Sequence, residues 1–266
     1  MVTTAAVTLP QKRSSGLHFG GLIWTLVRTD FKARYHGTFQ GFIWALLKPT
    51  MMFLVLMGVF SFIFASEPDY RLNLIIGLFL WDFFVQGTTV GLISLMTKGY
   101  LVSKAKFPSW IIVVTSISNA LITLAVFFVI ILAALTLSGH TPTLIAIALF
   151  GWYMIHFAAI VIGIALATSV LLPRFRDLNQ VWDVLMQAGF FIAPIIYPLN
   201  ILPERFHKFL YLWPPTPVIQ FARAVLITGT VPTLRAHVLL SLEAAVILSI
   251  GALTFRRYAP RAAEYL

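Results

Sequence analysis

The sequence predicts an all-α protein that crosses a membrane several times. Hydrophobic residues make up 59% of the chain and charged residues only 11%, against about 45–50% and about 25% in soluble domains. Long apolar stretches recur along the chain, and most of its 19 lysines and arginines lie in the short segments between them. This arrangement is typical of a polytopic membrane protein whose cytoplasmic loops carry the positive charge.

Six apolar stretches are long enough to cross a hydrocarbon core of about 30 Å. The positions of the basic residues between them place both termini in the cytoplasm. We therefore expect one transmembrane domain, residues 1–266, with six transmembrane helices. The expected spans are 42–65, 72–96, 109–136, 144–172, 178–197 and 234–255.

Residues 17–36 precede the first span and have apolar residues at a helical period. Their uninterrupted apolar run, Leu22 to Val27, is too short to cross a bilayer. We expect an interfacial helix on the cytoplasmic surface, with Arg28, Lys32 and Arg34 on its polar side. A signal peptide is the competing interpretation, but no small-residue cleavage signal follows the run.

The segment 198–232 connects the last two spans and is divided by prolines. Basic residues at 174 and 176 precede the fifth span, and those at 256 and 257 follow the sixth, so both pairs mark the cytoplasmic side. The chain must cross the membrane an even number of times between them, and the two spans already supply two crossings. The segment must therefore leave and return on the outer side. Pro203–Trp213 and Pro217–Thr228 would be helices of roughly 16 Å and 18 Å, too short to span.

These features predict a re-entrant helix pair at an outer mouth. Thr216 can cap the second helix and Gly229 can end it. Two carboxylates, Asp82 and Glu243, lie at membrane depth nearby, and Arg223 in the second helix is the nearest cation on that side. A charge at the membrane centre costs about 2.5–3.5 kcal/mol on insertion scales, so a partner is expected. Arg223 would either form a structural ion pair with Asp82 or Glu243, or contact the transported molecule.

Motifs of several other protein classes are missing from the sequence. It contains no phosphate-binding loop, no cysteine, and no metal-ligand spacing among its six histidines. The net charge of +10 forms no basic face outside the short loops, which argues against nucleic acid as a partner. We expect this chain to have no catalytic residue, bound metal or cofactor.

Three stretches of the sequence resemble the permeases of ABC exporters that carry polysaccharides and teichoic acids. The first runs from Arg28 to Pro49, RTDFKARYHGTFQGFIWALLKP, and the second from Gly77 to Pro108, ending in LVSKAKFP. The third runs from Arg176 to Gly229 and includes the pair Tyr197-Pro198. Together they cover nearly the whole chain in the family's order. The sequence departs from the family pattern at Pro214, usually asparagine, and at Asp82, usually a neutral polar residue.

The resemblance implies a homodimeric channel in the cytoplasmic (inner) membrane, driven by two copies of a separate ABC ATPase that binds ATP and Mg²⁺. The implied cargo is an O-antigen, capsule or teichoic-acid-like polysaccharide on a polyprenyl pyrophosphate lipid. In the family, the loop between the second and third spans, here 97–107, docks on the ATPase. The interfacial helix leads the lipid carrier to a lateral entrance, where cations suit a pyrophosphate.

Three groups of residues would carry these roles. The entrance for the lipid carrier would use Arg28, Lys32, Arg34 and Tyr35. Coupling to the ATPase would use Tyr100, Leu101, Val102, Lys104 and Phe107. The gate and pathway would use Trp81, Asp82, Phe191, Tyr197, Tyr211, Trp213, Arg223 and Glu243. Aromatic faces stack on sugars but also anchor helices at a membrane interface, and both interpretations stay open.

Three other function classes remain as alternatives. An exporter of a small molecule or lipid would share the same architecture. A membrane-embedded glycolipid transferase would need a catalytic base or metal ligands at a membrane face, where only isolated carboxylates occur. A secondary transporter would need inverted repeats with broken helices in both halves, and only the second half has them.

Overall fold

The computed structural model of the protein describes residues 19–35, 40–99 and 108–262. All regular structure in these ranges is helical, which confirms the predicted all-α fold. Five of the helices in this part are long and apolar enough to cross a membrane, and they correspond to five of the six predicted spans. They are α2 (Gln40–Ile63), α3 (Tyr70–Thr97), α5 (Trp110–Leu137), α6 (Leu144–Leu171) and α10 (Leu234–Ala262).

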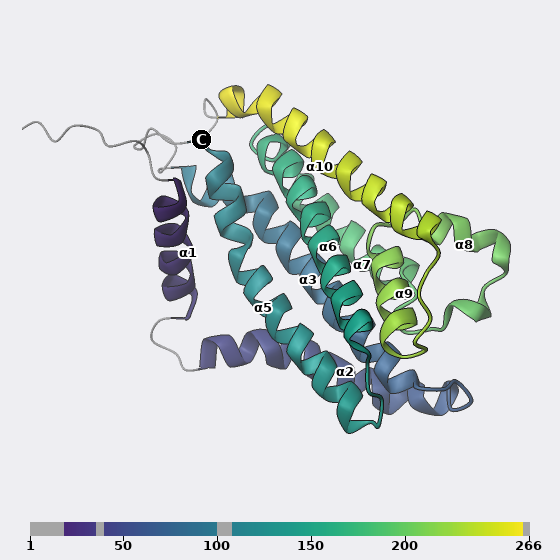
Figure 1. Ribbon diagram of the computed structural model, residues 1–266. Coiled ribbons are helices and arrows are strands. Elements are labelled where there is room, and N and C mark those ends of the chain that lie inside the picture. The colour runs from purple at the N-terminus through teal and green to yellow at the C-terminus, as the bar shows by residue number, and fades with distance from the viewer. Residues whose placement is uncertain (1–18, 36–39, 100–107, 263–266) are drawn as a thin grey trace, which may run out of the picture.

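The centre of the molecule is formed by α3, α5 and α6, and α10 packs along α6 (Figure 1). Aromatic rings fill the space between the central helices. Phe79 of α3 stacks on Phe127 of α5 with ring centroids 4.3 Å apart, and Phe84 stacks on Phe157 of α6 at 5.8 Å. These four rings are fully buried, so they contribute a large apolar area to the core.

Glycines bring three of the helices into direct backbone contact. A Cβ atom added to Gly251 of α10 would lie 2.0 Å from the carbonyl oxygen of Gly163 in α6. A Cβ added to Gly91 of α3 would lie 2.3 Å from the Cβ of Ala165 in α6. Small residues at such crossings permit close approach of the backbones. Helix α6 is therefore held tightly between α3 and α10.

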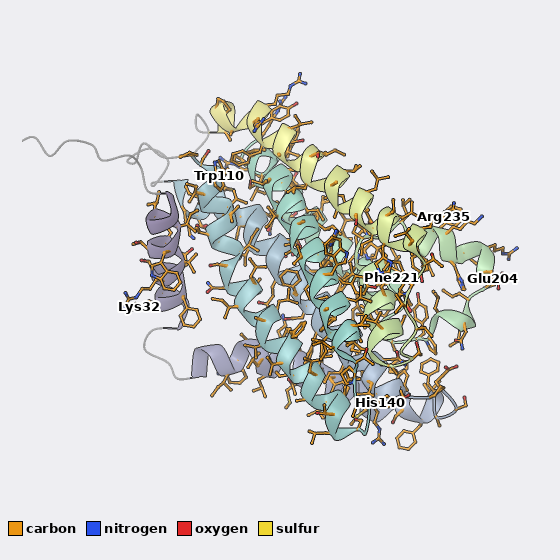
Figure 2. The ribbon with its side chains drawn as sticks, viewed as in Figure 1. Lys32, Trp110, His140, Glu204, Phe221 and Arg235 are labelled. Atoms are coloured by element: carbon orange, nitrogen blue, oxygen red, sulfur yellow. The ribbon has the colours of Figure 1, made fainter. Side chains whose placement is uncertain are left out.

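Helices α3 and α6 run parallel, because Phe84 contacts Phe157 and Gly91 contacts Ala165 further along both helices. Helices α6 and α10 also run parallel, because Tyr153 contacts His237 and Gly163 contacts Gly251. Helix α5 runs the opposite way, since Lys98 at the end of α3 contacts Ser116 near the start of α5. Figure 2 shows Trp110 and His140 at the two ends of α5. One end of the bundle, the basic end, carries the exposed side chains of Arg174, Arg176, Arg256 and Arg257 together with Lys98.

Helix α1 (Phe19–Tyr35) is a separate element, as predicted for residues 17–36. It packs against α5 and α2. Helix α2 lies across the bundle at a steep angle to α5 and α6 (Figure 1). Its apolar side chains are mostly exposed, and its main contact within the chain is with α3.

The predicted fifth span is wrong at its outer end. Helix α7 (Leu178–Ile192) has 15 residues and is therefore about 22 Å long, whereas the prediction extended it to Tyr197. Ala193 is extended, with φ −68° and ψ 132°, because the residue before a proline disfavours the α-helical conformation. Pro194 follows it and ends the helix.

The segment 198–232 contains three short helices, namely η1 (Leu199–Ile201), α8 (Glu204–Leu210) and α9 (Pro215–Leu226). The prediction of Thr216 as an N-cap is wrong, because α9 begins at Pro215, two residues before the predicted start at Pro217. Thr216 is fully buried inside the helix. Gly229 is in the left-handed conformation, with φ 65°, but α9 ends earlier, at Leu226 with Ile227 as its C-cap, so Gly229 belongs to the loop that follows.

Candidate functional site

A groove of about 700 Å³ lies between α2, α3 and α7. It forms where α2 crosses α3, because a steep crossing leaves open space beside the point of contact. Its lining is mostly apolar and includes Met51, Met52 and Val55 from α2. Polar groups enter it from all three helices, and they are Lys48, Asp82 and Gln187.

Asp82 lies about halfway along α3 and is partly exposed to the groove. The side-chain amide of Gln86, one helical turn further, donates a hydrogen bond to its Oδ2 atom. A carboxylate at this depth is expensive to expose to hydrocarbon. The groove gives Asp82 a place away from hydrocarbon, and its mostly apolar lining contains one acidic side chain, Asp82, and one basic side chain, Lys48.

An aromatic cluster forms one wall of the groove. Trp81 lies 5.9 Å from Phe190 and 6.5 Å from Trp213, measured between ring centroids. Gly189 of α7 makes room for the cluster, because a Cβ there would lie 2.5 Å from the ring of Trp213. The cluster joins α3, α7 and the start of α9, and Phe191 beside it is 68% exposed.

The structure brings only some of the predicted gate residues together. Trp81, Asp82 and Phe191 line the groove, and Trp213 contacts Trp81 behind it. The other residues lie elsewhere. Tyr197 donates to the carbonyls of Phe191 and Ile192 at 3.0 and 3.1 Å, Tyr211 packs on Phe221 with ring centroids 6.2 Å apart, and Glu243 is partly buried on α10.

The predicted ion pair between Arg223 and Asp82 or Glu243 is wrong. The buried guanidinium of Arg223 instead donates hydrogen bonds to backbone carbonyls, including Pro194 at 2.6 Å and Ile195 at 3.1 Å. Those carbonyls are available because the chain leaves the helical conformation after α7. Burial lowers the pKa of Arg223 to about 10, so its guanidinium stays charged at neutral pH.

The basic residues of α1 lie on its exposed face. Arg28 and Lys32 are both exposed and stand one helical turn apart, as predicted, and Trp24 beside them is 67% exposed. The side chains of Arg34 and Tyr35 lie outside the described residues. The opposite face of α1 packs towards α5.

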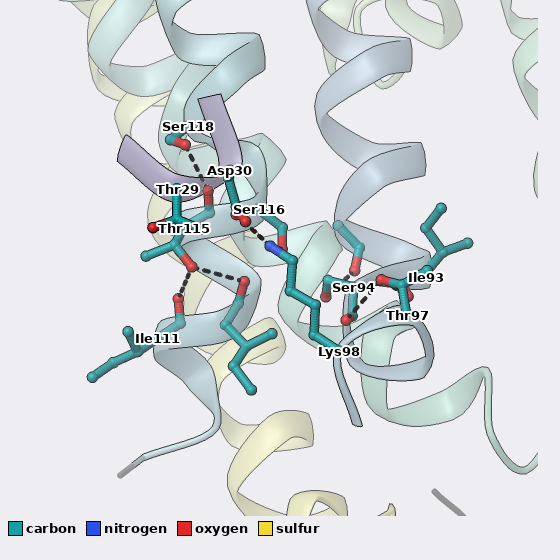
Figure 3. A network of polar contacts seen from close by, with 12 residues as sticks. Thr29, Asp30, Ile93, Ser94, Thr97, Lys98, Ile111, Thr115, Ser116 and Ser118 are labelled. Carbon is teal, nitrogen blue, oxygen red and sulfur yellow. Dashed lines mark hydrogen bonds and ion pairs between the residues drawn. The ribbon is translucent and has the colours of Figure 1, made fainter. Parts of the chain in front are cut away.

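An ion pair missed by the sequence analysis connects α1 with the central helices. Lys98 Nζ contacts the carboxylate of Asp30 in α1 and also bonds Ser116 Oγ of α5 at 2.8 Å (Figure 3). The exposed fractions of the Lys98 and Asp30 side chains are 21% and 19%. The sequence signal was an acidic residue within the apolar stripe of an otherwise basic helix.

The predicted coupling residues all lie outside the described part of the chain. They are Tyr100, Leu101, Val102, Lys104 and Phe107. Lys98 is thus close to the last described position before this segment. Within the described ranges, no group of three or more His, Asp or Glu side chains could hold a metal ion.

A protein-family model described as "ABC-2 type transporter" matches residues 21–227. The chain belongs to the ABC-2 type transporter family. It is therefore an integral membrane protein, in agreement with its long apolar helices. The part of this ABC-2 type transporter that matches includes α1, the groove, Arg223 and the Asp30–Lys98 pair. Of the predicted site residues, Glu243 alone lies beyond it.

Curated relatives of this ABC-2 type transporter include O-antigen export permeases and a polysialic acid transport protein. The chain is 25% identical over 266 residues to the O-antigen export system permease protein RfbA of Klebsiella pneumoniae, covering 98% of this chain and 100% of the relative. The RfbA protein of Myxococcus xanthus is 28% identical over 73% of this chain and 75% of its own. The polysialic acid transport protein KpsM of Escherichia coli is 25% identical over 86% and 89%.

Proposed function

We propose that this ABC-2 type transporter is the permease subunit of an ATP-driven exporter that moves a lipid-linked polysaccharide across the cytoplasmic membrane. The observation that supports this function best is the similarity along nearly the whole chain to an O-antigen export permease. A polysialic acid transport protein is also similar, over 89% of its length.

The proposed topology has six crossings, with both termini in the cytoplasm. Helix α7 and the turn segment 193–197 after it make the short fifth crossing, and η1, α8 and α9 form a re-entrant region on the outer side. The direction of the helices supports this arrangement, because α3, α6 and α10 finish together at the basic end. Basic residues concentrate on the cytoplasmic side of membrane proteins.

The exporter acts as a homodimer in this proposal, with the pathway between the two copies. Support comes from α2 and α7, whose exposed faces carry large apolar side chains that the single chain leaves uncovered. The face of α7 also exposes Gln180, Asp183 and Gln187. A surface with both aromatic and polar groups suits a glycan, because sugar rings stack on aromatic faces while their hydroxyls need hydrogen bonds.

A separate ATPase supplies the energy in this proposal. The sequence contains no phosphate-binding loop, so ATP hydrolysis requires a partner subunit that carries ATP and Mg²⁺. The partner docks on residues 97–107 at the basic end. The exposed Arg28 and Lys32 face the headgroup layer there and hold the pyrophosphate of the lipid carrier.

The test is reconstitution of the permease with its ATPase in vesicles loaded with lipid-linked polysaccharide. We expect ATP-dependent transfer of the glycan only when both subunits are present, and no hydrolysis by the permease alone. Replacing Tyr100, Leu101 and Val102 with glycine should abolish transfer while the permease remains folded. ATP-driven movement of a small molecule without movement of glycan would reject the proposal in favour of the small-molecule alternative.

A further inference from the structure

Asp30 occupies an unusual position on α1. The stripe of α1 that is partly buried is otherwise apolar, and it consists of Leu22, Ile23, Leu26, Val27 and Phe31. An ionised carboxylate among such residues needs a charged or hydrogen-bonded partner, because burial without one is costly. Lys98 provides that partner from the end of α3.

The pair is a junction of three helices. Lys98 reaches α1 through Asp30 and α5 through Ser116, at 2.8 Å from its hydroxyl oxygen. Both charged side chains are about four-fifths buried, so solvent screens their attraction less than it screens a surface pair. Figure 3 shows Lys98 extending from the last turn of α3 towards α1 and α5.

The junction fixes the rotation of α1 about its own axis. Because Asp30 points towards the bundle, residues on the opposite side of the helix point away from it. Arg28 and Lys32 are on that side and are exposed. Rotating α1 to bury these cations would separate Asp30 from Lys98. The ion pair therefore acts together with the apolar stripe beside it to keep the basic residues of α1 facing away from the bundle.

The junction also includes a residue of the segment assigned to the ATPase, 97–107, because Lys98 lies within it. Lys98 is two residues before Tyr100, and the α3 backbone continues without a break to Lys98, whose amide donates to the carbonyl of Ser94. A force applied to the chain beyond Lys98 would therefore act on Lys98 itself. From Lys98 it reaches α1 through the ion pair.

We propose that Asp30 and Lys98 are positioning residues of the transport cycle, whose ion pair makes α1 and its cations Arg28 and Lys32 move with the end of α3. This inference rests on the proposed function, because it assumes that an ATPase acts on residues 97–107. The inference adds that the binding of the lipid carrier at α1 depends on the nucleotide bound to the ATPase, and that the Asp30–Lys98 contact connects the two.

The test uses the reconstituted permease–ATPase complex and compares two single variants with their combination. Asp30→Asn and Lys98→Met should each lower glycan transfer about tenfold, a typical size for coupling between two sites, while ATP hydrolysis continues. The reversed pair, Asp30→Lys with Lys98→Asp, should restore most of the transfer. Glu264→Gln and Lys12→Met make the same changes in charge elsewhere and should transfer glycan at the native rate.

A second measurement follows α1 directly and does not depend on transfer. The native chain has no cysteine, so Thr29→Cys on the exposed face of α1 gives one reactive thiol. Its rate of reaction with a maleimide should change when ATP and vanadate are added. The change should disappear when Lys98→Met is introduced into the same chain.

Three results would overturn the inference. The first is a native rate of glycan transfer in both single variants. The second is a reversed pair that assembles with the ATPase but is as defective as the single variants. The third is a thiol at position 29 that still responds to nucleotide in the Lys98→Met background. Failure of the proposed function gives a different result, since the native complex itself would then transfer no glycan.

Discussion

The guanidinium of Arg223 donates two hydrogen bonds to one backbone carbonyl, that of Asn73, from Nε at 3.0 Å and from Nη2 at 2.6 Å. Asn73 is in the first turn of α3, and 150 residues separate it from Arg223. With its bonds to Pro194 and Ile195, the same side chain joins α9 to the start of α3 and to the chain that follows α7. One buried cation therefore fixes three segments relative to one another.

Replacing Arg223 with leucine should destabilise the protein by about 3 kcal/mol or more, because several carbonyls lose their donor and each buried unpaired group costs about 1–3 kcal/mol. Arg223→Lys should be intermediate, because an ammonium cannot reproduce the planar fork of the guanidinium. Thermal unfolding in detergent measures both effects. Arg205→Leu, at an exposed arginine, is the matched control, and equal unfolding temperatures for the two leucine variants would contradict the structure.

Gly77→Ala should act through Arg223. A Cβ at Gly77 would lie 2.6 Å from Nη2 of Arg223, so the alanine displaces the guanidinium from its carbonyls. The loss of stability should therefore become much smaller when Arg223 is already leucine, which a double-mutant cycle measures as a coupling energy. Additive losses in the double variant would show that the two residues do not interact in this way.

Gly251→Ala should destabilise the contact between α6 and α10, because its Cβ would lie 2.0 Å from a backbone oxygen of Gly163. The backbones must separate to admit it, and we expect a cost of about 1–3 kcal/mol, as for other overpacked sites. Gly151→Ala in α6 is the control, since no atom lies within 4 Å of its added Cβ. It should leave stability unchanged or raise it slightly. The comparison needs only the unfolding temperatures of the two purified variants.

Arg28→Ala combined with Lys32→Ala should reduce glycan transfer at least about tenfold, because each cation near an anionic headgroup layer is worth about 1 kcal/mol. The control is Lys12→Ala with Arg13→Ala, which removes the same charge from the N-terminal tail. Transfer is measured in the reconstituted complex at saturating ATP. Equal reductions by the two double variants would mean that the α1 cations contribute only general attraction to the membrane.

Single cysteines test the topology of the segment between α7 and α10. Asn200→Cys, Glu204→Cys and Thr230→Cys should all react with an impermeant maleimide added outside intact cells, since these exposed positions would share the outer side. Arg176→Cys, at the basic end, should react only after the cells are opened. Labelling of positions 200 and 230 from opposite sides would reject the re-entrant arrangement.

Much of the fold could be predicted because hydrophobic length and basic flanks are local properties of the sequence. The end of α7 was also readable in principle, since Pro194 disfavours helix at Ala193. The partners of Arg223 could not be predicted. A search for opposite charges finds carboxylates, whereas the actual partners are backbone carbonyls left without helical hydrogen bonds where a helix ends. Asp30 and Lys98 are 68 residues apart, and neither charge by itself indicates the other. Likewise, nothing near Gly163 in the sequence points to Gly251.

The backbone contact of Gly163 with Gly251 also limits how the molecule can change shape. Two helices whose backbones touch without intervening side chains have no flexible rotamers with which to accommodate sliding or rotation. Helices α6 and α10 therefore behave as one rigid body, and the contact of Gly91 with Ala165 adds α3 to it. Any opening of the protein must then be carried by helices outside this body, such as α2 and α7.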